Sequence, residues 1–171
     1  SDVCSSDLYE VAPLRGVLNV LADHNLTYLA VDGEDLTLDA NKALAEVIKN
    51  NITLTDLQLT NTGLTDGFMQ CLAAGFSKNN TLTSVNLSHN RIGDDGVSNL
   101  CDGLYINITL QSLVLSHNSI SDVGAVHLSD LLSANVSLMS VDFSHNTIGH
   151  LGATAISKAI STNTLLEKLE L

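Results

Sequence analysis

Three histidines recur at a constant interval along the chain, and imidazole is the side chain best suited to bind a metal ion or to titrate near neutral pH. They are His89, His117 and His145, each within a Ser-His-Asn triplet. The constant interval predicts a linear column along one edge of a repeating structure, whereas zinc needs three or four ligands that converge on one ion. We therefore expect a feature of the repeat rather than a metal site. A modest pH response is expected, because adjacent imidazoles resist charging together near their reference pKa of about 6.5.

The sequence contains no motif that predicts catalysis. It lacks the GxSxG, P-loop and HExxH patterns, and the Ser before each recurring His cannot act as its nucleophile because neighbouring residues on a strand point to opposite faces. Cys4, Cys71 and Cys101 are odd in number and follow no metal-ligand spacing, which indicates free thiols in a reducing compartment. We predict no catalytic residue, no cofactor, no metal ligand, and a protein that is not an enzyme.

The composition restricts the class of partner. The 171 residues are 44% hydrophobic, which is enough for a packed core. Seven Lys and Arg against 19 Asp and Glu give a net charge of −12, which argues against nucleic acid and against an anionic membrane surface. No apolar run reaches the roughly 18–20 residues that a membrane-spanning helix needs. We expect a cytoplasmic protein whose partner is another protein.

The elements that position these residues come from an internal 28-residue repeat. In each unit a leucine at a fixed position opens the pattern LxxLxL, as in LTDLQL and LQSLVL, and no insertion interrupts the spacing. The alternation predicts a strand whose leucines point inward and whose intervening residues lie on the opposite face. The units begin at Leu26, Leu54, Leu82, Leu110, Leu138 and Leu166. Five of six N-x-S/T sequons are generated by this repeat, so the sequons do not indicate secretion: they begin at Asn25, Asn51, Asn79, Asn86, Asn107 and Asn135.

Each unit continues from its strand through a loop into a helix. An Asn after the strand is expected to bond the backbone of neighbouring turns, and an Asp shortly after it is predicted to be the helix N-cap. Apolar residues four apart then predict a helix of about 11 residues with one buried face. A second Asn closes the helix and is expected to take the left-handed conformation. The three columns are Asn90, Asn118 and Asn146; Asp66, Asp94 and Asp122; and Asn51, Asn79, Asn107, Asn135 and Asn163.

A strand, a loop and a helix cannot cover their own apolar face, so the units must stack. Units such as NNTLTSVNLSHNRIGDDG resemble the ribonuclease-inhibitor-like class of leucine-rich repeats, as in ribonuclease inhibitor, Ran GTPase-activating protein and the sensor regions of NOD-like receptors. The resemblance covers residues from about Val17 to Leu171. It implies an α/β fold, namely a right-handed leucine-rich-repeat solenoid with parallel strands on the concave side and helices on the convex side. It also implies that the solenoid recognises proteins.

The ends of the chain differ from the repeat. Residues 1–8, SDVCSSDL, fit no repeat column and are expected to be a non-native tail, and residues 9–25 are expected to form a partial repeat. The solenoid itself is predicted over residues 26–171, as a fragment of a longer protein. Its last strand has no polar cap, so we expect self-association through uncapped ends.

The candidate partner-binding surface consists of the outward-facing strand positions, which are mostly small and polar. We expect it to bind a protein as an interaction scaffold. The alternative is part of a GTPase-activating protein of the Ran type, in which the loop residue Arg91 would contact the GTPase. The predicted surface residues are Asp56, Gln58, Ser84, Asn86, Ser88, Ser112, Val114, Ser116, Ser140, Asp142 and Ser144.

Overall fold

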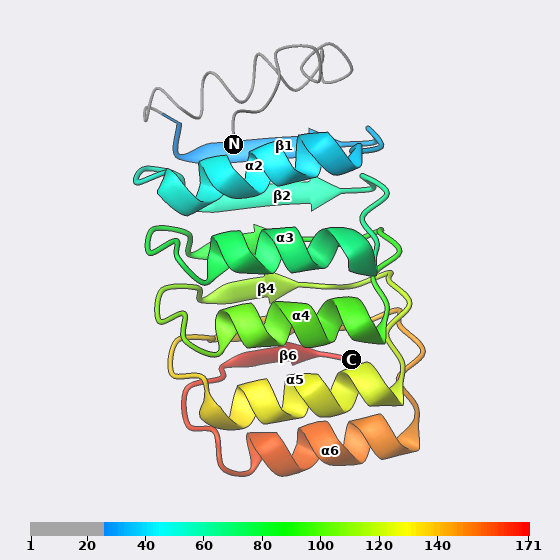
Figure 1. Cartoon of the computed structure of the whole chain (residues 1–171). Helices are drawn as coiled ribbons and strands as arrows, with labels where there is room; N and C mark the ends of the chain where they lie inside the picture. The colour runs from blue at the N-terminus through cyan, green and yellow to red at the C-terminus, as the bar shows by residue number, and fades with distance from the viewer. Residues whose placement is uncertain (1–25) are drawn as a thin grey trace.

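The computed structural model describes residues 26–171, in which strands and helices alternate (Figure 1). The predicted tail (1–8) and partial repeat (9–25) lie outside the described residues. The strands are β1 (Tyr28–Asp32), β2 (Asp56–Thr60), β3 (Ser84–Asn86), β4 (Ser112–Val114), β5 (Ser140–Asp142) and β6 (Lys168–Glu170). The helices are α2 (Leu38–Asn50), α3 (Asp66–Phe76), α4 (Asp94–Leu104), α5 (Asp122–Ala134) and α6 (His150–Ile160). Within residues 26–171, no helix combines the length and apolar character needed to cross a membrane.

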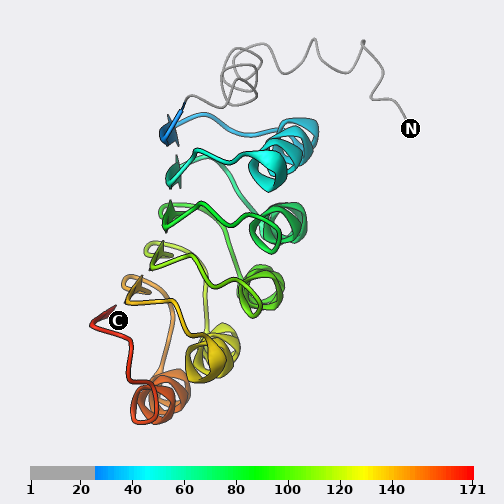
Figure 2. The same ribbon diagram turned by 90° about the vertical axis from the view of Figure 1, so that its left-hand side faces the viewer.

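The strands form one parallel sheet in chain order, β1 to β6. Each strand pairs with the next in the register of the repeat, for example Leu57 with Val85 and Leu113 with Val141. The strands line the inner side of an arc and the helices the outer side, where they are spaced more widely (Figure 2). In the described part of the chain, each helix contacts only the helices of adjacent units. The predicted α/β solenoid is confirmed.

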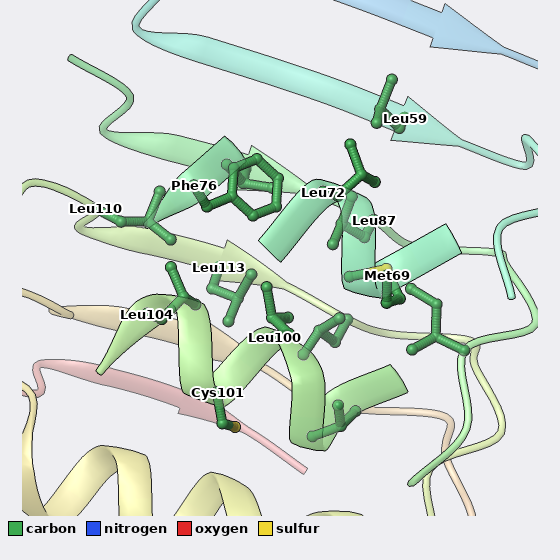
Figure 3. Packing of buried hydrophobic residues seen from close by; sticks show 14 of the residues in the cluster. Leu59, Met69, Leu72, Phe76, Leu87, Leu100, Cys101, Leu104, Leu110 and Leu113 are labelled. Carbon is green, nitrogen blue, oxygen red and sulfur yellow. The ribbon is translucent and has the colours of Figure 1, made fainter. Parts of the chain in front are cut away.

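The core lies between the sheet and the helices and consists of the repeated leucine columns (Figure 3). All three apolar positions of LxxLxL are buried in the inner units, as Leu54, Leu57 and Leu59 show at 0% exposure. Leu100 and Leu104, four residues apart on α4, are also buried and close the core from the helical side. The predicted inward face of the strands and buried face of the helices are both confirmed.

The Asn column at the helix ends joins neighbouring units, although not in the predicted backbone conformation. Asn51 and Asn135 have φ of −74° and −70°, so they are extended rather than left-handed. These Asn residues join the units through hydrogen bonds of their side-chain amides. Asn107 Nδ2 donates to the carbonyls of Phe76 and Asn79 in the preceding unit, and its Oδ1 accepts from the amides of Thr109 and Leu110. The Asn side chains of this column are also buried, so these sequons are not accessible to glycosylation in the folded chain. They are Asn51, Asn79, Asn107 and Asn135.

The Asp column caps the following unit rather than its own helix. The N-cap residues are Thr65, Gly93 and Ser121, one position before each Asp, which corrects the prediction. Asp94 Oδ1 instead accepts from the amides of Ser121 and Gly124, both at the start of α5. Burial raises the pKa of Asp94, but these bonds and one from the Ser121 hydroxyl outweigh it, so its pKa lies below the usual value. A carboxylate at a helix N-terminus also complements the helix dipole.

Close approach of α3 and α4 depends on Gly103. A β-carbon there would lie 2.5 Å from the carbonyl oxygen of Ala73 on α3. We expect Gly103→Ala to destabilise the protein by about 1–3 kcal/mol, because the helices must move apart despite the better helix propensity of Ala. Gly67→Ala is the matched control, since nothing lies within 4 Å of its added β-carbon. It should stabilise by up to about 1 kcal/mol in urea denaturation. Equal shifts for both variants would contradict this packing.

Candidate partner-binding surface

The candidate surface is the inner side of the arc, where outward-facing strand residues stand in register. We call two of these columns, together, the concave surface: one comprises Asp56, Ser84, Ser112, Ser140 and Lys168, and the other Gln58, Asn86, Val114, Asp142 and Glu170. From β2 to β5 every one of these side chains is half-buried, because the neighbouring strands flank it. Most of these side chains are small and polar, and the first column continues onto β1 with Tyr28, an exposed aromatic residue that pairs in register with Asp56.

Three further residues of the predicted surface, Ser88, Ser116 and Ser144, follow the ends of β3, β4 and β5 one repeat apart. Ser88 and Ser116 are only 6% and 8% exposed, so the expectation that they face solvent is wrong; Ser144 is half-buried. The physical reason is that β3 and β4 end at Asn86 and Val114, before these serines. The Ser116 hydroxyl hydrogen bonds to the Asp142 carboxylate of the next unit, and the amide of Ser144 donates to the same carboxylate at 2.8 Å.

Charge on the concave surface is concentrated toward β5 and β6. Burial raises the pKa of Asp142, but hydrogen bonds from Ser144 and Ser116 outweigh burial, and nearby Lys168 lowers it further, so the pKa lies below its usual value. Asp142 is thus held ionised at neutral pH. Lys168 Nζ forms an ion pair with Glu170 Oε1 at 2.6 Å, and this contact raises the pKa of Lys168. With Asp56 on β2, acidic groups outnumber basic ones across the surface.

The three histidines form a stacked column beside this surface. The ring centroids of His89 and His117 lie 4.1 Å apart, and those of His117 and His145 lie 4.0 Å apart, with interplanar angles of 13° and 12°. The predicted stack is confirmed, and the rings lie closer than the roughly 4.8 Å between strands. All three residues are exposed and have positive φ, as does Asn61 at the same position of the preceding unit.

The positive φ of this column was not predicted from the sequence. A signal was present, because Gly33, Asn61 and the three histidines occupy one repeat position, and Gly, Asn and His all tolerate the left-handed region. The turn is held by the Asn that follows each His. Asn90 Nδ2 donates to the carbonyls of Leu59 and Leu87 at 2.7 and 2.9 Å, as predicted for that column.

The three rings are stacked in a row rather than gathered around one point, as the ligands of a metal ion would be. No cluster of three or more His, Cys, Asp or Glu within residues 26–171 could hold a metal ion.

Burial raises the pKa of the Cys101 thiol to about 12, and the charges of Asp102 and Asp130 contribute to this rise. This thiol stays protonated and packs as a small apolar group, as predicted.

Acidification is expected to destabilise the fold through His117. The flanking imidazoles shield it from water and lower its pKa, charge on His145 and His89 lowers it further, and Asp142 opposes them. The unfolded chain takes up this proton near pH 6.5 and the folded chain only at lower pH. The unfolded state therefore binds more protons in this interval, and the free energy of unfolding should fall as the pH drops below about 6.5.

The test compares urea denaturation at several pH values for the wild type and His117→Asn. Asn adopts the required positive φ, as Asn61 shows, so the substitution removes the imidazole without straining the turn. We expect a weaker pH dependence in His117→Asn. His150→Asn removes an exposed imidazole outside the column and is the control. An unchanged pH dependence in His117→Asn would contradict the assignment.

The fold and surface together define a leucine-rich-repeat solenoid, a class of repeat protein with an open inner sheet. A family model described as "Leucine Rich repeat" matches residues 78–101, 107–129 and 134–157, which are successive units of the arc. No curated protein sequence matches the chain.

Solved structures are similar to this chain in fold at low sequence identity. "Leiomodin-1 Actin-Binding Site 2" aligns with a TM-score of 0.74 and 20% identity, over 87% of this chain and 88% of that chain. The tropomodulin C-terminal domain of Caenorhabditis elegans aligns with a TM-score of 0.71 and 14% identity, over 87% and 92%. The Chaetomium Mex67:Mtr2 structure aligns with a TM-score of 0.53 and 19% identity, over 91% and 88%. At these identities the likeness extends to the fold alone.

Proposed function

We propose that the chain is a non-catalytic interaction scaffold whose concave surface binds a protein partner. The observation that carries the proposal is the in-register sheet. Strands β2 to β6 present the same two positions at each step, which makes an even surface along the inner side of the arc. The side chains on β2 to β5 are half-buried between neighbouring strands, so they lose few degrees of freedom on binding.

The charge of the surface favours a partner with a basic patch. Asp56 and Asp142 are acidic, the chain as a whole carries a net charge of −12, and Lys168 is already paired with Glu170. Such complementarity steers association and sets specificity. Actin is the first candidate to test, because one of the similar structures is named an actin-binding site.

The experiment measures binding to immobilised actin and, separately, to proteins captured from a lysate. Asp142→Lys reverses a charge on the concave surface, and Ser112→Lys adds a longer, charged side chain to it. Asp130→Lys on α5 makes the same charge change as Asp142→Lys at an exposed convex position and is the matched control. We expect the two concave variants to weaken binding at least tenfold (about 1.4 kcal/mol) and the control to leave it unchanged. Because Asp142 also accepts local hydrogen bonds, thermal denaturation must show that each variant remains folded.

Equal loss in the concave variants and the convex control would contradict the proposed surface. Binding to a protein other than actin would support the scaffold role and would exclude only actin as the partner. The GTPase-activating alternative receives no support from the family model or the similar structures. Its direct test is phosphate release from a GTP-loaded small GTPase with wild type and Arg91→Ala.

We also propose that the units are of the ribonuclease-inhibitor-like type and that the protein is cytoplasmic. The uninterrupted 28-residue spacing and the full α-helix in each complete unit support the first proposal. The free state of Cys71 and Cys101 supports the second, since exported proteins commonly pair their cysteines.

A further inference from the structure

Two neighbouring turns in the middle of the solenoid carry exposed apolar side chains. These turns lie where a helix ends and the next strand begins, on the left in Figure 1. The turns touch, because Asn135 Nδ2 donates to the carbonyl of Asn107 at 3.1 Å. We call the four apolar residues the turn patch: Tyr105, Ile106, Ile108 and Val136, which are 61%, 63%, 72% and 66% exposed.

The fold does not require large apolar residues at these positions. The repeat provides an internal comparison, because the turn after every other described helix occupies the same place in its own unit. The position of Tyr105 holds Lys or Ser in those units, and the position of Ile106 holds Asn, Lys, Ala or Thr. In the preceding unit the turn reads SKNN where this one reads YINI. Exposed apolar groups that the fold does not need indicate contact with another molecule.

A groove lies beside Ile106, between α3 and α4 on the helical side of the arc. Its volume is about 310 Å³, and small residues such as Ala73, Ala74 and Gly103 line it. Small side chains on two neighbouring helices leave room for a side chain of a third helix to enter between them. The groove and the turn patch meet at Ile106, so one ligand can contact both.

The charge of the groove indicates the chemistry of its ligand. The residues that line it are all described, and among them only Asp102 is charged. Asp102 is exposed, and it forms no ion pair within residues 26–171. An unpaired carboxylate beside apolar side chains favours a Lys or Arg of the ligand. The net charge of −12 also attracts a basic segment from a distance.

We propose that the turn patch and its groove bind an amphipathic helix of a partner protein. Apolar side chains of that helix pack against Tyr105, Ile106 and Ile108, one of them enters the groove, and a Lys or Arg faces Asp102. The site lies at the helix ends and on the helical side, so it is separate from the concave surface. It does not depend on the partner proposed for that surface.

Two other ligands fit the charges less well. An anionic membrane would place negative headgroups against Asp102, on a chain that is itself strongly acidic. A second copy bound symmetrically would bring the same groove, in which no lining residue is basic. Asp102 would then remain without an opposite charge. A basic helix of another protein supplies both the apolar contacts and that charge.

The probe is a phage-displayed library of amphipathic helical peptides of about 18 residues, or five turns. The peptides share one apolar face, and their polar positions are randomised. The library is selected on the immobilised 171-residue chain, and the dissociation constants of selected peptides are measured by fluorescence anisotropy. We expect the selected peptides to be enriched in Lys and Arg over the starting library.

The apolar contacts are tested by Tyr105→Ser combined with Ile108→Asn. This double variant has the residues that the preceding unit holds at the two positions, Ser77 and Asn80, so the fold should persist. We expect it to raise the peptide dissociation constant at least about tenfold. Ile52→Asn makes the same change as Ile108→Asn two units earlier, at a residue that is 67% exposed, and should leave binding unchanged.

The charge contact is tested by Asp102→Lys, measured in about 0.15 M salt to screen distant charges. The repeat accommodates Lys at this position, as Lys158 on α6 shows. We expect basic peptides to bind Asp102→Lys at least about tenfold more weakly, and exchange of their basic residues for Glu to restore binding. Asp95→Lys makes the same charge change at an exposed position at the start of α4 and is the control.

Restored binding of the acidic peptide requires a folded surface, so the charge exchange tests the site even if the double variant misfolds. A library that yields no peptide, or peptides without an excess of Lys and Arg, would overturn the proposal. So would equal effects of the double variant and Ile52→Asn. Binding to phosphatidylserine vesicles or self-association that the double variant abolishes would assign the turn patch to a membrane or to a second copy instead.

Discussion

Asn107→Ala is expected to lower the free energy of unfolding by about 2–4 kcal/mol, a large effect for one polar side chain. The Asn107 amide nitrogen donates at 3.0 Å to both Phe76 and Asn79, and its oxygen accepts from Thr109 and Leu110 at 3.0 and 2.8 Å. Alanine leaves these four backbone groups without this partner, at a position that is 6% exposed. Buried groups without partners lose their hydration without compensation.

Urea denaturation followed by circular dichroism measures the change, and Asn80→Ala provides the comparison. Asn80 is an exposed residue beside Asn79, at the start of the same kind of turn, and its loss should change stability by less than about 0.5 kcal/mol. If the two variants were equally mild, the Asn column would not join the units, and the stacking would depend on the sheet, the Asp column and the apolar contacts.

Leu113→Ala should destabilise the protein by about 2–5 kcal/mol, because it opens a cavity between stacked units. Leu113 is 1% exposed and lies in the middle of the sheet, paired with Val85 on one side and Val141 on the other. Neither neighbour can move into the space without breaking the strand register. The cost should therefore lie toward the upper part of this range.

Ser112→Ala is the control for Leu113→Ala, since Ser112 precedes it on β4 and faces the opposite side. Ser112 is half-buried on the concave surface, and its loss should change stability by less than about 0.5 kcal/mol. Equal effects of the two substitutions would show that the inward and outward faces of the strand are wrongly assigned.

The repeat interval alone was enough to predict the order, direction and register of the strands. An uninterrupted 28-residue repeat brings each leucine to the same place in successive units, and the structure pairs Leu57 with Val85 accordingly. The burial of Leu57 and Leu113 followed from strand alternation. These features depend on the periodicity of the chain rather than on any single side chain.

Interactions between units could not be predicted in the same way. An Asp near the start of a helix suits both its own N-cap and the backbone of the next unit, and residue type does not distinguish the two. Asp94 binds Ser121 and Gly124 because the loop before α5 passes its carboxylate. The Ser116 side chain likewise bonds to Asp142 of the next unit instead of facing solvent. The strand pattern predicts where the concave surface lies, but its mostly small side chains do not specify a partner.

The restriction of helix contacts to adjacent units has a consequence for how this protein responds to tension. No described helix touches a helix beyond its neighbour, so detaching an end unit leaves the bonds of the inner units intact. A chain pulled by its ends would therefore unravel unit by unit. Each event would release one 28-residue unit, or about 95 Å of extended polypeptide, so force-extension traces would show evenly spaced peaks. A protein bound across several strands would clamp those units together and delay the corresponding peaks.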